Sequence, residues 1–393
     1  MNKSKSKIDY LLLLCLFCIG IISIISLMSA QDLIPPKLAD TNFAQKQMIW
    51  YIFGGFMILM TMLIDFDRYK YIIWYIYAFG MLLLLGLEFL DKIPFFIEKE
   101  IVLTLNNATS WYGIPGIGTF QPAELMKLVL ILVLSQIIAK HNEQHLFPTK
   151  QDDWLLIGKI TAVSLPPLLL IIKQPDLGSA MVIIAIVAAI MIVSGIRFRY
   201  IMLIAGSVIA IGAFLVWFYF QFPDIFTKYI PEYQLGRFYG WLLPYEYPEY
   251  GYQLQKGLLS IGSGMLLGKG FSENNVYVPE PQTDFIFAVF SENFGFIGAS
   301  ILVALFFILI YRVIITGIES NDPYGSYICA GIVGLLTFQV FQNIGMTIGL
   351  LPITGIPLPF VSYGGTSLLI YMICIGLVLN VRSRTKEFMF AEK

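Results

Sequence analysis

The chain has 393 residues, of which 58% are apolar and only 13% are charged, and its formal net charge is −1. Soluble domains carry about a quarter charged residues, so this composition indicates a membrane protein. The balanced charge gives no basic patch of the kind that nucleic-acid binding requires, and we therefore expect no nucleic-acid partner.

The apolar residues are gathered in runs of about 20, the length that a helix needs to cross a bilayer. They predict a single all-α, polytopic membrane domain over residues 1–393, with about ten spanning helices. The first run is long, lacks a clear cleavage site and is followed by more spans, so no cleavable signal is expected. The predicted spans cover about residues 10–30, 48–64, 71–90, 122–140, 154–172, 178–195, 200–220, 285–316, 326–350 and 361–380.

Two of the connecting segments are long. Residues 91–120 form a less apolar loop that contains Trp111. Residues 222–283 form a large loop between the seventh and eighth spans, which is rich in Tyr, Pro and Gly and includes Arg237 and Gln253. A loop of this length without obvious structure of its own is usually functional.

Prolines and glycines mark where spans begin, bend or break. Pro122 is a good first-turn residue and predicts the start of the fourth span. The eighth span is long enough to be tilted or broken at Gly295 and Gly298. The segment 351–367, which forms the entry to the tenth span, is rich in Pro and Gly and predicts a broken, re-entrant-like turn, which is tolerated at membrane depth where it lines a cavity.

Lysines and arginines in the short loops favour one orientation. If the N-terminus is cytoplasmic, the inside collects the basic residues 1–7, the pair Arg197 and Arg199, and the tail with Arg382 and Arg384. An even number of spans then places both termini in the cytoplasm and both long loops on the outer face.

The cysteines and histidines of the chain do not indicate a catalytic or metal-binding site. All four cysteines lie in apolar runs, and although Cys15 and Cys18 have the C-x-x-C spacing, buried free thiols are the better interpretation. The only two histidines, His141 and His145, share one polar loop. We therefore expect neither a histidine-based triad nor a zinc site.

Asp284 stands where the large loop runs into the eighth span. In one interpretation it is an acid in the first turn of a helix, where it favours the macrodipole and Thr283 caps the helix. In the other it is functional, because a carboxylate at a membrane-embedded site is costly unless it is used. Partial burial would raise its pKa and the helix end would lower it again, which suits a general base.

Three further charged residues, Glu124, Lys127 and Glu292, can each be interpreted as structural or as functional. Glu124 and Lys127 are i,i+3 neighbours on one helix face. They form either a salt bridge near the interface with the lysine snorkelling, or a site whose ammonium faces a cavity for an anionic headgroup. Glu292 lies about two turns beyond Asp284, and either an ion pair or a substrate contact would explain it.

Interhelix hydrogen bonds are the simplest account of three amides in the ninth span, Gln339, Gln342 and Asn343.

These features together predict an outward-facing polar cavity in a ten-span protein, with an acid at its mouth and cations nearby. An enzyme that acts on a lipid-linked substrate and a transporter of such a substrate both fit, and composition does not separate them. A transporter would be expected to show repeat symmetry between its halves, which is not evident in this sequence.

Five segments resemble the shape, elongation, division and sporulation (SEDS) family and occur in the order found in that family. Those around residues 277–289 and 341–346 are most similar to the rod-shape members of Gram-positive bacteria. The segments are QPAELMK (121–127), QPDLGSA (174–180), YGYQLQKGLLSIGSGMLLGKG (250–270), YVPEPQTDFIFAV (277–289) and FQNIGMTIGLLPITGIPLPFVSYGGTSL (341–368).

The resemblance implies a peptidoglycan glycosyltransferase of cell-wall elongation, which polymerises lipid II into β-1,4-linked glycan strands at the outer face of the bacterial cytoplasmic membrane. The essential aspartate of the family lies in a T-D-F element, which here is Thr283-Asp284-Phe285. Asp284 is thereby implied as the general base that deprotonates the acceptor 4-hydroxyl, which attacks the donor's anomeric carbon with inversion. The implied partners are lipid II, a class B penicillin-binding protein that supplies the transpeptidase, and other membrane proteins of the elongation machinery.

The pyrophosphate leaving group of this reaction needs cationic or metal stabilisation. We expect Lys127 and Arg237 to supply cations and Gln253 to supply a polar contact, and a divalent cation stays open as a cofactor. The predicted substrate-binding residues are Lys127, Arg237, Gln253, Glu124, Trp111 and Glu292.

The chain departs from the family pattern in two places. Basic residues commonly precede the tryptophan ahead of the QPxE element, but residues 107–110, before Trp111, are Asn-Ala-Thr-Ser, which weakens the expected cation role of that loop. Asn293 follows Glu292 where the family usually has a second acid, so a paired-carboxylate role is not predicted. The alternatives are a lipid II transporter, a scaffold for the transpeptidase, and the division or sporulation member of the same family.

Overall fold

The computed structural model describes residues 8–38, 40–64, 66–90, 93, 101–105, 108–114, 118–222 and 232–385. Within these ranges nine helices are long and apolar enough to cross a membrane, and α7 is a shorter apolar helix of 17 residues. These helices coincide with the predicted spans, so the all-α polytopic architecture is confirmed. Their bounds are α1 (Tyr10–Ala30), α2 (Phe43–Leu63), α3 (Phe66–Leu90), α5 (Pro122–Gln144), α6 (Lys150–Lys173), α7 (Leu177–Val193), α8 (Phe198–Gln221), α12 (Ile286–Glu319), α13 (Pro323–Thr347) and α14 (Gly365–Arg384).

Local signals in the sequence set several helix ends. Pro122 occupies the first turn of α5, as predicted, where its missing N–H is not needed. Thr149 and Asp152 form a capping box at the start of α6. The Asp176 carboxylate accepts a hydrogen bond from the Ser179 N–H at 2.9 Å and caps α7. Two 3₁₀ turns, η1 (Gln31–Leu33) and η2 (Pro36–Leu38), follow α1.

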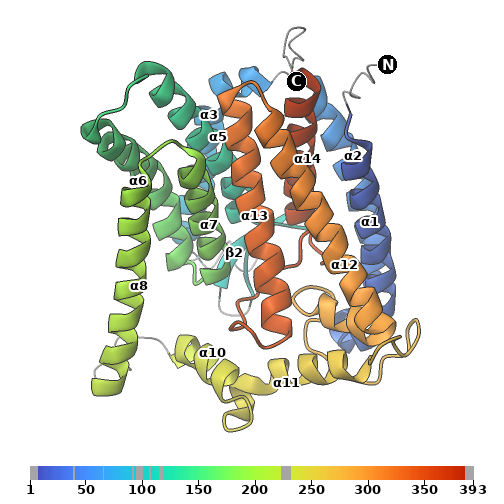
Figure 1. Cartoon of the computed structure of the whole chain (residues 1–393). Coiled ribbons are helices and arrows are strands. Elements are labelled where there is room, and N and C mark those ends of the chain that lie inside the picture. Colours follow the sequence, from blue (N-terminus) through green and yellow to red (C-terminus); the bar gives the residue numbers. More distant parts are fainter. Residues whose placement is uncertain are drawn as a thin grey trace.

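The centre of the bundle is formed by α5, α13 and α14, each of which has more than half of its apolar window buried. α13 packs against α7, α12 and α5, while α14 packs along α2. α8 lies at the edge of the bundle beside α7, and none of its apolar window is buried (Figure 1). An apolar helix with so much exposed surface is stable only where lipid surrounds it.

A small antiparallel sheet occupies part of the segment that the sequence analysis treated as a loop. Its strands are β1 (Val102–Leu105), β2 (Ala108–Ile114) and β3 (Gly118–Phe120), in the order β1-β2-β3. Strands this short give no readable alternation in the sequence. The sheet reaches α14, where the Thr366 hydroxyl donates to the Thr119 carbonyl at 3.0 Å.

The predicted large loop at 222–283 is partly helical in the structure. α10 (Glu232–Leu242) and α11 (Pro248–Ser263) lie across one end of the bundle (Figure 1). The Trp241 indole N–H donates to the Gly349 carbonyl at 2.9 Å, which fastens α10 to the turn after α13. Residues 223–231 lie outside the described ranges.

The two ends of the bundle differ in what they carry. α1 begins and α14 ends at one end, which we call the terminal face, and α10 and α11 lie at the opposite end, which we call the site face (Figure 1). At the terminal face Arg312 and Arg382 contact Asp9 with N–O distances of 2.7 and 3.4 Å. The basic residues 1–7, on which the predicted orientation partly depends, lie outside the described residues.

α12 is broken at Gly295, as predicted, whereas Gly298 stays helical. Gly295 has φ 64° and ψ −164°, a conformation that favours glycine, and an added Cβ would collide with the backbone of Gly268. The loop 265–270 crosses the break and supplies partners for the backbone groups that the helix leaves unpaired. The bridging hydrogen bonds run from Lys269 N to Glu292 O (3.0 Å), Gly270 N to Asn293 O (3.2 Å), Phe296 N to Met265 O (2.9 Å) and Ile297 N to Leu266 O (3.2 Å).

Candidate active site

Asp284 lies in a turn before α12 and not in the first turn of the helix, so that part of the prediction is wrong. Glu280 has φ 50°, and its carbonyl accepts from the N–H groups of Thr283 (3.2 Å) and Phe285 (3.4 Å). Phe285, and not Thr283, occupies the N-cap position of α12, and no side chain makes a capping hydrogen bond there. Thr283 therefore does not cap the helix. Asp284 therefore lies at the site face in a turn that precedes α12, and it is not part of the helix.

Residues from α13 and the segment 352–363 hold this turn from the other side. The Asn343 amide donates to the Asp284 carbonyl at 2.9 Å and to the Ile356 carbonyl at 2.8 Å. The Ser362 hydroxyl donates to the Thr283 carbonyl at 2.6 Å, and the Tyr363 N–H donates to the Gln282 carbonyl at 2.8 Å. The Pro- and Gly-rich segment thus supports the turn that carries Asp284.

Replacing Asn343 with leucine is expected to loosen this support. Asn343 is fully buried, and its loss leaves two carbonyls without their donor, which costs about 3 kcal/mol in total. The thermal midpoint of the purified protein should therefore fall. Gln342→Leu is the matched control, because Gln342 donates only to the Pro352 carbonyl, at 3.0 Å, and its loss should have a smaller effect. Equal midpoints for Asn343→Leu and the wild type would contradict this role.

The Asp284 carboxyl group faces a small set of groups that control its charge. Gly355 lies beside it with φ 73°, and a Cβ built there would be 3.5 Å from Asp284 Oδ2. Arg237 of α10 donates to the Thr354 carbonyl at 3.4 Å, next to Gly355. Burial and the nearby Glu280 carboxylate raise the pKa of Asp284 to about 7, while Arg237 and the Thr283 hydroxyl act in the opposite direction. Asp284 is therefore close to half ionised at neutral pH.

Arg237 is close enough to Asp284 to affect the charge of its carboxyl group, whereas Gln253 and Trp111 make no polar contact with Asp284 among the described residues. Gln253 is on α11, one turn before Gly257, and Gly257 packs against the Phe285 ring. The Gln253 side chain is half-buried and makes no hydrogen bond to any residue that the structure describes. Trp111 lies in β2 opposite Leu103, and no polar contact joins it to the Asp284 turn among the described residues.

Glu124 and Lys127 form an ion pair, the first of the two interpretations, with a distance of 2.7 Å between Lys127 Nζ and Glu124 Oε1. The predicted snorkelling is wrong, because Lys127 is only 1% exposed and Glu124 only 3%. The second carboxylate oxygen, Glu124 Oε2, has no hydrogen-bond partner within the described part of the chain. Removing either partner of such a buried pair would leave an uncompensated charge.

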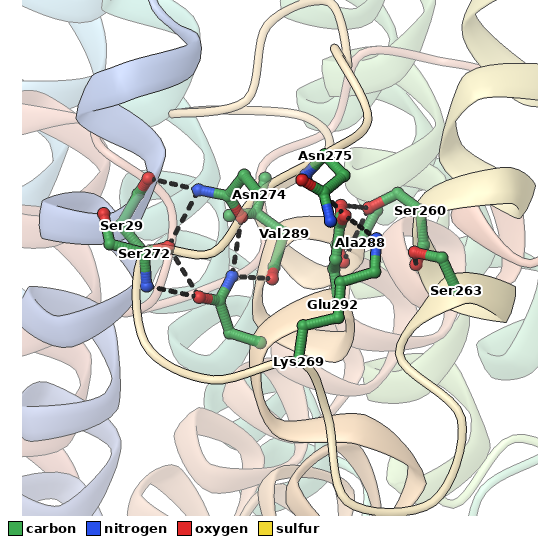
Figure 2. A network of polar contacts seen from close by, with 11 residues as sticks. Ser29, Ser260, Ser263, Lys269, Ser272, Asn274, Asn275, Ala288, Val289 and Glu292 are labelled. Carbon is green, nitrogen blue, oxygen red and sulfur yellow. Dashed lines mark hydrogen bonds and ion pairs between the residues drawn. The ribbon is translucent and has the colours of Figure 1, made fainter.

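Glu292 forms an ion pair, which is the structural one of the two interpretations (Figure 2). Lys269 Nζ lies 2.6 Å from Glu292 Oε1, and the carboxylate also accepts from the Ser260 hydroxyl (2.8 Å) and the Asn275 N–H (2.9 Å). Glu292 is fully buried. The network therefore locks α11 and the loop after it to the first part of α12.

Asn293 extends this network to α1. Its amide donates to Asn274 Oδ1 at 2.7 Å, and its oxygen accepts from the Ser29 hydroxyl at 2.9 Å. Figure 2 shows Asn274 towards Ser29 at one end of the network, with Glu292 and Lys269 towards the other end. The side-chain amide of Asn293 thus both donates and accepts hydrogen bonds. An ionised carboxylate at this position could only accept them.

Within the described ranges, no three His, Cys, Asp or Glu side chains gather in a way that could hold a metal ion. Asp284 and Glu280 are the acids that act on each other at the site. Without a third protein ligand, two carboxylates hold Mg²⁺ only together with waters and substrate phosphates.

Comparison with known proteins identifies the family. The sequence model of the cell cycle protein family of FtsW, RodA and SpoVE matches residues 7–387. The chain belongs to the FtsW/RodA/SpoVE family. The resemblance to the SEDS family is thereby confirmed, and it covers nearly the whole chain.

Relatives of this family member carry division and sporulation names. It is 30% identical over 348 residues to the stage V sporulation protein E of Bacillus subtilis, with 86% of each chain covered. It is 32% identical over 349 residues to the probable peptidoglycan glycosyltransferase FtsW of Geobacter metallireducens, which covers 88% of this chain and 86% of the relative.

Two solved structures have the same fold as this family member. RodA of Thermus thermophilus superposes with a TM-score of 0.66 at 24% identity, covering 99% of this chain and 100% of that one. A chain of a peptidoglycan synthase complex that coordinates polymerization and crosslinking superposes with a TM-score of 0.76 at 24% identity, covering 95% and 97%. The polytopic helical fold is therefore the fold of the family.

Proposed function

We propose that the protein is a peptidoglycan glycosyltransferase that polymerises lipid II into β-1,4-linked glycan strands. The observation that carries the proposal is a carboxyl group, Asp284, with a pKa raised to about 7 and a rigid support at the site face. A general base works best when its pKa lies near the working pH. Relatives named as peptidoglycan glycosyltransferases support the same conclusion.

In this reaction Asp284 takes the proton from the 4-hydroxyl of the acceptor sugar. The oxygen attacks the anomeric carbon of the donor, the bond to the lipid pyrophosphate breaks, and the configuration inverts from α to β. Arg237 stabilises the negative charge that develops on the pyrophosphate. Lys127 is the second proposed cation, and it reaches a phosphate only if its ion pair with Glu124 opens.

The remaining predicted contacts divide into two groups. Gln253 and Trp111 are proposed to contact the sugar and headgroup of the substrate. Glu292 acts indirectly, because its ion pair with Lys269 holds the loop and the first part of α12 behind Asp284.

The orientation, partner and cellular role belong to the same proposal. The terminal face is cytoplasmic and the site face is outside, because the short loops at the terminal face carry more of the lysines and arginines. The partner is a class B penicillin-binding protein, supported by the fold shared with a chain of a peptidoglycan synthase complex. Elongation and rod shape are the proposed role, with division or sporulation as the alternative within the family.

Purified protein with lipid II tests the proposal. The class B partner is present with its transpeptidase site inactivated, so that polymerisation alone is observed. The expected product is a ladder of glycan strands that a β-1,4-specific muramidase digests. Absence of a ladder, together with movement of lipid II between the leaflets of vesicles, would show a transporter instead.

The polymerisation rate is expected to rise with pH and level off above about pH 8. Only the ionised form of Asp284 accepts a proton, and its pKa is raised to about 7, so the rate should fall about tenfold per unit well below pH 7. Initial rates measured across about pH 5 to 9 check this. Arg237→Gln should move the midpoint up and Glu280→Gln should move it down, because those two groups shift the pKa in opposite directions. A flat profile, or shifts of the same sign, would contradict the assignment.

A further inference from the structure

Three cations in or beside the spans are paired with acids, whereas Lys159 of α6 is paired with none that the structure describes. Lys127, Lys269 and Arg197 each lie within 2.7 Å of a carboxylate oxygen. Lys159 forms no ion pair with any described residue, although it lies within the apolar window of α6. An ammonium group within a spanning helix that no acid compensates is a sign of function.

The contact that Lys159 does make is with a neutral ring. Its Nζ lies 3.3 Å from Nδ1 of His141, in the last turn of α5. An ammonium group has only donors, so Nδ1 of His141 must accept the hydrogen bond and the imidazole is uncharged. His141 therefore orients the lysine without compensating its charge.

A cavity of about 330 Å³ lies beside this pair, between α5 and α6. Its lining contains two lysines and no acid: Ile137, Lys140, His141, Gln144 and Lys159. Neither of the two acids at the start of α6 forms an ion pair with these lysines. Asp152 acts on His141 and lies 3.4 Å from Nε2 of His145. Asp152 accepts from the N–H and hydroxyl of Thr149, and Asp153 forms an ion pair with Arg197. The cavity thus presents net positive charge.

The cavity lies at the terminal face, where α5 ends and α6 begins (Figure 1). The link between these helices exposes two large apolar side chains, Leu146 (80% exposed) and Phe147 (92% exposed). Trp154, on the first turns of α6, is also exposed and packs on Tyr200 with ring centroids 5.1 Å apart. Exposed apolar and aromatic side chains beside lysines are typical of a membrane interface.

We infer that this cavity binds the phosphate headgroup of an anionic phospholipid in the leaflet at the terminal face. Lys159 and Lys140 provide the charge, Gln144 provides a hydrogen-bond donor, and Leu146 and Phe147 anchor the link in the acyl region. Basic pockets between spanning helices on the cytoplasmic side commonly bind anionic headgroups. The site lies at the opposite end of the bundle from Asp284 and takes no part in the glycosyl transfer.

Native mass spectrometry of the intact protein in detergent tests the inference. Phosphatidylglycerol or phosphatidylcholine is titrated, and the first bound lipid is counted. We expect the wild type to prefer phosphatidylglycerol, and Lys140→Gln/Lys159→Gln to bind it about 30-fold more weakly, since each lysine near an anionic surface contributes about fivefold. Lys150→Gln is the matched control, an exposed lysine at the start of α6 outside the cavity, and should bind as the wild type does.

Three results would overturn the inference. The double variant could bind phosphatidylglycerol as tightly as the wild type, or both lipids could bind equally well. Alternatively, excess inorganic phosphate could displace the lipid as well as excess phosphatidylglycerol does, which would show a site for free phosphate. The variant Lys140→Arg/Lys159→Arg keeps both positive charges. If the protein binds headgroups through these two cations, this variant should prefer phosphatidylglycerol as the wild type does. It thereby distinguishes an effect of lost charge from an effect on folding.

Discussion

Replacing Asp284 with asparagine is expected to lower the rate of lipid II polymerisation by about 10²- to 10⁴-fold, the contribution that a general base typically makes. Asparagine has nearly the same shape as aspartate but accepts no proton at neutral pH. The measurement is the initial rate of glycan formation by the variant and the wild type at equal concentrations of folded protein.

The fold should survive this substitution. The turn is held through the backbone carbonyls of residues 282–284, which Asn343, Ser362 and Tyr363 contact, and those bonds do not use the carboxylate. A carboxyl group whose pKa is raised to about 7 destabilises the folded state once it is ionised. The thermal midpoint of Asp284→Asn at pH 8 should therefore equal or exceed that of the wild type.

Glu280→Gln is the matched control for this experiment. Glu280 is an exposed acid in the same turn, but the mechanism gives it no proton to accept. Its variant should keep most of the polymerisation rate at pH 8, where Asp284 is ionised in both proteins. Equal rates for Asp284→Asn and the wild type would remove Asp284 from the chemistry.

Replacing Lys269 with methionine is expected to destabilise the protein by about 3 kcal/mol or more, because Glu292 is left as a buried charge without its cation. Only the Ser260 hydroxyl and the Asn275 N–H would remain as donors to that carboxylate. For a chain of this length the thermal midpoint should fall by about 5 °C. Thermal unfolding in detergent, followed by intrinsic fluorescence, measures this effect.

A double variant separates the ion pair from the packing. Lys269→Met combined with Glu292→Gln removes both charges, so its midpoint should lie above that of Lys269→Met alone. Lys46→Met is the control for losing a lysine, because Lys46 is exposed on α2. If Lys269→Met unfolds at the same temperature as Lys46→Met, the ion pair does not stabilise the loop.

The spanning helices were predictable because each is a run of about 20 apolar residues, a property of the local sequence alone. The break at Gly295 was predictable for a similar reason, since a glycine in an overlong span is a local signal. The sheet at 102–120 was not, because strands of three to seven residues carry too few alternating positions.

The candidate site was predictable only in part. The T-D-F element identified Asp284, but its position in a turn depends on the positive φ of Glu280, which no pattern in the sequence signals. Glu280 itself, four residues before Asp284 in the same polar run, was overlooked. Lys269 was overlooked as the partner of Glu292, because the two lie 23 positions apart and meet only when the loop crosses the broken helix.

The support of the Asp284 turn also has a consequence for biosynthesis. The aspartate is translated well before the residues that hold it, which come from α13 and from positions 352–363. A ribosome that has just finished α12 has already made Asp284 and Arg237, yet the carbonyls of residues 282–284 still lack the donors that hold the turn. The active site is therefore completed only when the last two helices have been inserted into the membrane. A premature stop codon within α13 would abolish it while leaving every earlier residue unchanged.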